Sequence, residues 1–164
     1  MVNHNIKYIK IPSFCEDLAE ETGIHLGDGC MNIFKRKGGI TYYYSITLHA
    51  LDDKDYIDYI INKMEELYNI KPYIRKLHNN NTLQVTYFSK ALVEFKRQSG
   101  LLMSPKEDIK IPEWICNNKN FMTACIRGIV DTDGTIVFKK KYKRYHYYPM
   151  IKVSSISKFL IEQL

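Results

Sequence analysis

The pattern Gly23-Ile24-His25-Leu26-Gly27-Asp28-Gly29 occurs a second time, in varied form, as Gly128-Ile129-Val130-Asp131-Thr132-Asp133-Gly134. Each copy closes an apolar, helix-like segment with an Asp-Gly pair and leads into a strand-like segment. The two copies are 105 positions apart (133 − 28), and other identical residues, such as Lys35 and Lys140, recur at this offset. A repeat of this kind indicates two related structural units. We therefore expect each unit to bring one carboxylate, Asp28 or Asp133, to a shared place.

The composition of the 164 residues is that of a globular protein with room for one domain or two small ones. The chain has no run near the roughly 20 apolar residues of a membrane-spanning helix, and its start lacks the apolar core of a signal peptide. We therefore expect no membrane partner and a cytoplasmic location. The net charge of +6 favours a polyanionic partner such as a nucleic acid.

The cysteines do not form a recognisable ligand or disulfide pattern. There are four, and the closest pair, Cys116 and Cys125, is nine positions apart (125 − 116). We expect the thiols to act as small buried apolar groups, and keep a disulfide or a zinc site as less favoured alternatives.

Hydrophobic periodicity predicts the order of elements in each unit. In the first unit it predicts a helix that ends at Gly29 and then two strands, at 31–34 and 40–50. A helix at 53–69, a hairpin with strands at 72–77 and 82–88, and a helix at 89–99 follow. In the second unit it predicts a helix at 121–132, a strand that begins at 135 and a second strand at 147–155. The start of a helix follows from 157. We divide the chain into a first repeat at 1–100, a connector at 101–120 and a second, incomplete repeat at 121–164.

Small residues four apart on each motif helix predict that the two helices pack closely. Gly23 and Gly27 share one face of the first helix, and Gly128 and Thr132 share one face of the second. Such packing places Asp28 and Asp133 side by side at helix C-termini, where the helix dipole and their mutual repulsion both disfavour negative charge. A divalent cation offsets both costs, and oxygen ligands suit Mg²⁺. We expect Asp28, Asp133, Gly27 and Thr132 to form a metal site, and expect His25 to be a packed or interface residue rather than a ligand.

Basic residues cluster at the tip of each predicted strand pair, and tyrosines follow them. We expect DNA contacts from both tips and from Tyr42 and Tyr44 on the paired strands; the tip residues are Lys35, Arg36, Lys37, Lys139, Lys140, Lys141, Lys143 and Arg144. A solvated charged surface is the competing interpretation, and the paired acids favour DNA.

The segment Cys125-Ile126-Arg127-Gly128-Ile129-Val130-Asp131-Thr132-Asp133-Gly134 resembles the signature of the LAGLIDADG (dodecapeptide) homing endonucleases. Glu21 to Gly29 resembles a divergent first copy, and the connector from Lys106 to Ile115 is similar to the segment before the second motif. The resemblance implies an α+β fold, an αββαββα unit repeated about a pseudo-twofold axis at the motif helices, here with the second repeat incomplete. It also implies a saddle-shaped sheet on double-stranded DNA, Mg²⁺-dependent cleavage, and Asp28 and Asp133 as the metal-binding catalytic acids.

The resemblance further implies a Lys or Gln near the metal, from the second strand of a repeat. His49 and Lys152 are the nearest polar residues there, and we assign Lys152 this catalytic role. Pseudo-symmetry within one chain favours a monomer, and the incomplete repeat leaves a dimer open.

Two functions from different classes follow. The first is a site-specific DNA endonuclease, favoured because both acids are present. The second is a DNA- or RNA-binding protein on the same scaffold without catalysis, favoured by the incomplete second repeat. A basic interaction domain in which the Asp-Gly pairs are turns remains the third alternative.

Overall fold

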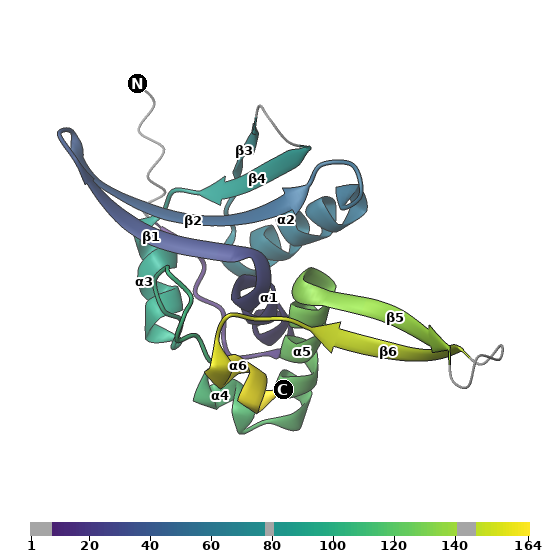
Figure 1. Ribbon diagram of the computed structural model, residues 1–164. Helices are drawn as coiled ribbons and strands as arrows, with labels where there is room; N and C mark the ends of the chain where they lie inside the picture. The colour runs from purple at the N-terminus through teal and green to yellow at the C-terminus, as the bar shows by residue number, and fades with distance from the viewer. Residues whose placement is uncertain (1–7, 78–80, 141–146) are drawn as a thin grey trace.

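The computed structural model describes residues 8–77, 81–140 and 147–164 (Figure 1). Along the chain they form α1 (Glu16–Asp28), β1 (Gly29–Arg36), β2 (Gly39–His49), α2 (Lys54–Tyr68), β3 (Tyr73–Lys76), β4 (Thr82–Tyr87), α3 (Lys90–Gln98), α4 (Glu113–Cys116), α5 (Lys119–Asp133), β5 (Gly134–Lys140), β6 (Tyr147–Val153) and α6 (Lys158–Gln163). The first seven elements follow the predicted order αββαββα. That prediction is confirmed.

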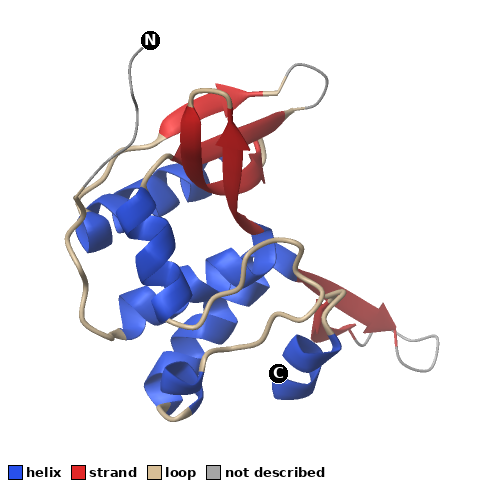
Figure 2. Ribbon diagram, turned by 90° about the vertical axis from the view of Figure 1, so that its left-hand side faces the viewer, coloured by secondary structure: helices blue, strands red, loops and turns tan. Residues whose placement is uncertain are grey.

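The first unit is built on an antiparallel four-stranded sheet with the order β1-β2-β4-β3. Successive side chains of a strand point to opposite faces, so alternate residues of β2 lie on the helix-covered face. Tyr44, Ile46 and Leu48 are buried on that face. Figure 2 shows the helices gathered on one side of this sheet, which leaves the other side open.

The second unit contributes a two-stranded sheet, β5 with β6, in the described residues. Gly134 pairs with Val153, just as Gly29 pairs with Ile46 in the first unit. The offset between the units is therefore 105 in the first strand (134 − 29) and 107 in the second (153 − 46). The second hairpin is two residues longer, so the ungapped offset does not hold beyond its loop.

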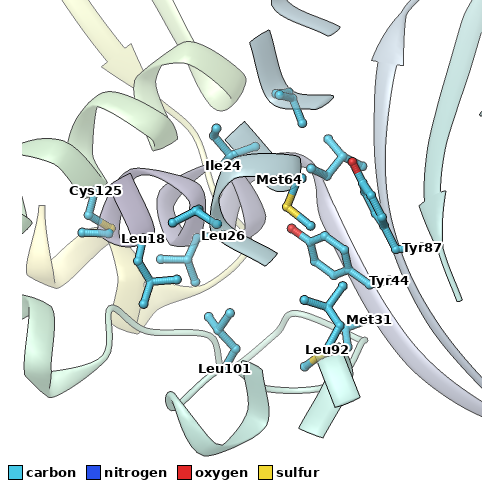
Figure 3. Packing of buried hydrophobic residues seen from close by; sticks show 14 of the residues in the cluster. Leu18, Ile24, Leu26, Met31, Tyr44, Met64, Tyr87, Leu92, Leu101 and Cys125 are labelled. Atoms are coloured by element: carbon cyan, nitrogen blue, oxygen red, sulfur yellow. The ribbon is translucent and has the colours of Figure 1, made fainter. Parts of the chain in front are cut away.

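Helix α1 is the central element of the core. Every residue from Leu18 to Leu26 is buried, because α5 packs on one side of the helix and the first sheet and its helices pack on the other. Figure 3 shows Met64 of α2 and Leu92 of α3 close to Tyr44 and Met31 of the sheet, with Cys125 of α5 on the far side of α1.

A buried polar cluster fastens α1 to the rest of the first unit. Lys96 of α3 lies 2.6 Å from both carboxylate oxygens of Glu21, and both side chains are almost fully buried. The hydroxyls of Tyr44 and Tyr68 donate to the same carboxylate at 2.8 and 2.9 Å. A buried charge is tolerated only when it is paired in this way, so the cluster fixes α1, α2, α3 and β2 relative to one another.

The structure also bears on the expectations for the cysteines and for membrane-spanning helices. All four cysteines are free; Cys125 is buried in the core, whereas Cys116 is exposed, so the buried, apolar interpretation does not extend to Cys116. None of the helices in the described segments is both long and apolar enough to cross a bilayer.

Candidate metal and DNA-binding site

The two motif helices, α1 and α5, meet at their glycines. A Cβ on Gly23 would lie 2.1 Å from the carbonyl oxygen of Cys125, and one on Gly128 would lie 2.3 Å from that of Glu20. A Cβ on Gly27 would lie 1.9 Å from Oγ1 of Thr132. The backbones approach closely because no side chain separates them. The prediction of an interface through these four residues is confirmed.

The helix contact aligns the ends of α1 and α5. Asp28 is the last residue of α1, Asp133 is the last residue of α5, and each precedes the first strand of its sheet. The Cγ atom of Asp133 lies 3.6 Å from the Cβ position of Gly27, the residue next to Asp28. The helix interface therefore brings the two acids together, as the repeat predicts.

The electrostatics of the pair favour a bound cation. Burial raises the pKa of Asp28 to about 6, and the negative charge of Asp133 adds to this effect. Burial also raises the pKa of Asp133. Both acids resist ionisation in this environment, so a positive charge between them stabilises the ionised pair.

Lys106, from the connector, is a residue of this site that the sequence interpretation missed. Its Nζ atom donates to the carbonyl oxygens of His25 at 3.0 Å and Leu26 at 3.1 Å, and also to that of Gly27. Burial lowers the pKa of Lys106, while the charges of Asp133 and Asp28 oppose that shift. The ammonium group thus satisfies the last carbonyls of α1 and offsets the charge of both acids. No local periodicity marks such a residue; only its place in the predicted connector could have drawn attention to it.

The oxygen atoms at this site suit a hard divalent cation that takes only part of its coordination shell from the protein. Two carboxylates stand beside backbone carbonyls, while no cluster of three or more His, Cys, Asp or Glu side chains suited to a metal occurs among the described residues. Mg²⁺ is commonly held by one or two carboxylates, with water and substrate phosphates completing its octahedral shell. Asp28 and Asp133 are therefore the residues that would hold it.

The other residues predicted for the metal site have different surroundings. The Thr132 hydroxyl donates to Gly128 and Ile129 of its own helix at 2.9 and 3.1 Å and fills the space over Gly27, so its place is that of a packing residue. Lys152 is exposed in β6 and pairs across the strands with Thr135. His49 lies at the end of β2, where its Nδ1 atom is 2.8 Å from Asp52.

His25 is a packed residue, as expected. It is buried, and its ring stacks on that of Tyr44 with centroids 5.4 Å apart. Burial lowers its pKa well below the ordinary value, and the positive charges of Lys96 and Lys106 lower it further. The imidazole is therefore neutral, and its Nδ1 atom has no hydrogen-bond partner among the described residues.

The open face of the first sheet carries Tyr43, not the two tyrosines predicted to contact DNA. The prediction for Tyr44 is wrong, because its ring is fully buried under the helices. Tyr42 shares the helix-covered face with Tyr44, and Lys90 of α3 lies 5.8 Å from the centroid of its ring. Neighbouring residues of a strand point to opposite faces of the sheet, so a choice that is wrong by one residue assigns the side chain to the wrong face.

A concave groove of about 450 Å³ lies on this open face. Its residues come from all four strands and the end of β4, and they are Cys30, Phe34, Thr41, Tyr43, Tyr73, Arg75, Gln84, Thr86 and Phe88. The Tyr43 hydroxyl accepts a hydrogen bond from Gln84 at 3.0 Å. The groove combines aromatic, amide and guanidinium groups, which are the groups that read base edges and phosphates.

The basic tips are described only in part. Lys35 and Lys37 are exposed at the end of the β1–β2 hairpin. Lys141, Lys143 and Arg144 lie outside the described residues, as do the side chains of Arg36, Lys139 and Lys140.

Solved structures with this architecture include those of homing endonucleases. The I-DmoI structure in complex with DNA and Mn has a TM-score of 0.53 and 22% identity, over 73% of this chain and 63% of that one. A single-residue variant of I-DmoI with its target DNA in the presence of Mg has a TM-score of 0.53 and 21% identity, over 73% and 62% of the two chains. The LAGLIDADG meganuclease I-AabMI bound to uncleaved DNA has a TM-score of 0.50 and 13% identity, over 84% and 65%. This chain thus spans less than two thirds of each of these proteins. No family model matches the chain, and no curated protein does.

Proposed function

We propose that this chain, which has the fold of the LAGLIDADG homing endonucleases, is a site-specific DNA endonuclease that acts with a divalent cation, Mg²⁺ in the first instance. One observation carries the proposal: Asp28 and Asp133 end two helices packed backbone to backbone, and each leads directly into a sheet. A repeat that served only to make turns would not need its two acids to meet beside a half-buried lysine.

The cation, the two acids and Lys106 have separate roles in the proposed reaction. Asp28 and Asp133 would hold the cation, which would supply an activated water molecule and stabilisation of the leaving oxygen of the phosphodiester. Lys106 fixes the last turn of α1, and so the position of Asp28, through three backbone carbonyls.

The open face of the first sheet would bind the duplex. The groove around Tyr43, Arg75 and Gln84 suits base edges, and Lys35 and Lys37 at the hairpin tip suit backbone phosphates. The solved complexes of the same fold with DNA and Mn or Mg support this assignment.

The test is cleavage of a randomised duplex library with Mg²⁺, with D28N and D133N beside the wild type. Each substitution keeps the size of the side chain and removes one metal-ligating charge. We expect either change to abolish cleavage and to leave DNA affinity at or slightly above that of the wild type, because a negative charge beside the phosphates is lost. Asp108 is an exposed acid of the connector, so D108N is the matched control and should cleave as the wild type does.

The second candidate is a DNA-binding protein that does not cleave. It is favoured by the second sheet, which has two strands in the described residues where the first has four. Tight, selective binding of one duplex without Mg²⁺-dependent nicking would establish this candidate and exclude the endonuclease.

A further inference from the structure

Gln84 and Tyr43 form a fixed polar contact on the open face of the first sheet. The Gln84 amide donates to the Tyr43 hydroxyl at 3.0 Å, and the Ser45 hydroxyl donates to the same oxygen at 2.6 Å. Ser45 is completely buried. The Tyr43 ring is packed as well, because the centroids of the Phe34 and Phe88 rings lie 6.0 and 6.2 Å from its own. The amide of Gln84 thus meets a hydroxyl whose position is already set.

This contact leaves Gln84 with the two groups that recognise one particular base. One amide N–H is used on Tyr43, while the other N–H and the carbonyl oxygen have no partner among the described residues. In the major groove of DNA, adenine presents the N7 acceptor beside the N6 donor, and one amide pairs with both. The free side of the Gln84 amide therefore suits adenine.

Arg75 lies directly across from Gln84, on the neighbouring strand β3. Its side chain is exposed, and no acidic residue lines the groove to which both side chains belong. A guanidinium group pairs with O6 and N7 of guanine, which is the commonest specific contact of proteins with bases. Arg75 therefore suits guanine.

The pairing of β3 with β4 sets the distance between these two side chains. Directly opposite residues of an antiparallel pair have Cα atoms about 4.5–5.5 Å apart and project from the same face. Successive base pairs of DNA are about 3.4 Å apart along the helix axis. Because Gln84 suits an A·T pair and Arg75 suits a G·C pair, the spacing places their contacts on neighbouring base pairs.

We propose that Gln84 selects an adenine and that Arg75 selects a guanine in the neighbouring base pair of the target duplex. Tyr43 is a positioning residue, because its hydroxyl holds the Gln84 amide while the amide contacts the base. The assignment rests on the proposed function in one respect, that the open face binds duplex DNA, and it does not require cleavage.

The test is the selection of bound duplexes from a randomised library in the absence of a divalent cation, which measures binding apart from cleavage. We expect the wild type to enrich an adenine in one base pair and a guanine in the next. Q84A should lower the preference for adenine about tenfold or more and keep that for guanine, and R75A should do the reverse. Y43F removes only the hydroxyl and should cause a smaller loss, at the adenine alone.

Two neighbouring residues of α3 provide matched controls. Arg97 and Gln98 are exposed on one of the helices that lie on the other side of this sheet (Figure 2). R97A and Q98A should therefore select the same duplexes as the wild type. A purely structural effect of Q84A or Y43F would weaken binding to all sequences equally, whereas loss of recognition is confined to one base pair.

Three results would overturn the proposal. If Q84A and R75A enrich the same bases as the wild type at every position, neither side chain selects a base, and the endonuclease proposal is unaffected. Losses at two base pairs that are not neighbours would contradict the spacing set by β3 and β4. If the wild type enriches no sequence, site-specific recognition fails together with this assignment. The expected selection by a protein that never cleaves would instead support the assignment and exclude the enzyme.

Discussion

The Nζ atom of Lys106 donates a hydrogen bond to the carbonyl oxygen of Gly27, the residue that precedes the first acid of the site. The same atom reaches the carbonyls of His25 and Leu26, so one connector side chain closes the end of the central helix. The connector is thus part of the site and not only a link between the two units.

Replacing Lys106 tests this contact. K106M removes three hydrogen bonds to carbonyls at a negative helix end, and we expect it to lower the free energy of unfolding by about 1.5–3 kcal/mol. Urea denaturation measures the change. K110M is the control, because Lys110 is exposed in the same connector, and its effect should stay within about 0.5 kcal/mol. Equal effects of the two variants would contradict a specific role for Lys106.

The glycines of the helix interface give a second prediction. Alanine normally stabilises a helix relative to glycine, but a Cβ at Gly23 or Gly128 meets the backbone of the facing helix. We expect G23A and G128A each to destabilise the fold by about 2–3 kcal/mol, because backbone cannot move aside as a flexible side chain can. Thermal melts measure this, and G38A, where nothing lies within 4 Å of the added Cβ, should be close to neutral. A G128A protein that melts at or above the wild-type temperature would exclude the close approach.

The acid pair predicts a pH dependence. The pKa of Asp28 is about 6 in the folded protein, above its ordinary value of 3.8, so the folded state binds the proton more tightly than the unfolded state. Its contribution to stability is therefore fully present below about pH 4 and is lost as the pH rises to about 6. D28N should be more stable than the wild type at neutral pH and equal to it near pH 4, as measured by urea denaturation at both values. A gap between D28N and the wild type that does not change with pH would contradict the prediction.

Metal affinity should follow the opposite trend. A divalent ion needs the ionised carboxylates, so Ca²⁺ binding measured by calorimetry should strengthen as the pH rises through about 6. Affinity that is independent of pH between about 5 and 7 would mean that Asp28 is not a ligand.

The buried ion pair of Glu21 and Lys96 predicts a large and partly reversible loss. K96M leaves the Glu21 carboxylate buried without its cation and should cost about 3–5 kcal/mol of unfolding free energy. Adding E21Q should recover part of the loss, because the amide carries no charge. K90M removes an exposed lysine of the same helix and should be close to neutral. A double variant as unstable as K96M would show that the charge is not the cause.

DNA binding predicts a change in salt dependence. If Lys35 contacts a phosphate, K35A should weaken binding to all sequences and lower the slope of log K against log salt by about one unit. Fluorescence anisotropy at several salt concentrations measures this slope. Lys158 is also exposed but lies on α6 and not in either sheet, so K158A should leave the slope unchanged. An unchanged slope for K35A would make the tip an ordinary solvated surface.

The sequence determined the features that repeat or alternate along the chain. The double motif predicted two units and the meeting of Asp28 with Asp133, and the small residues four apart predicted the helix interface, because helical spacing alone places them on one face. The order of helices and strands in the first unit followed from periodicity in the same way.

Only the tertiary structure decided which residues of distant segments meet. Tyr43, and not Tyr42 or Tyr44, lies on the open face of the sheet. The pairing of β2 with its neighbours and the helices that bury Tyr44 decide which β2 side chains point to that face. The contact of Lys106 with the end of α1 spans about 80 residues of sequence and has no local signal. The physical reason is the same in both cases: local propensity fixes the direction of a side chain within its own element, while long-range packing chooses what that side chain touches.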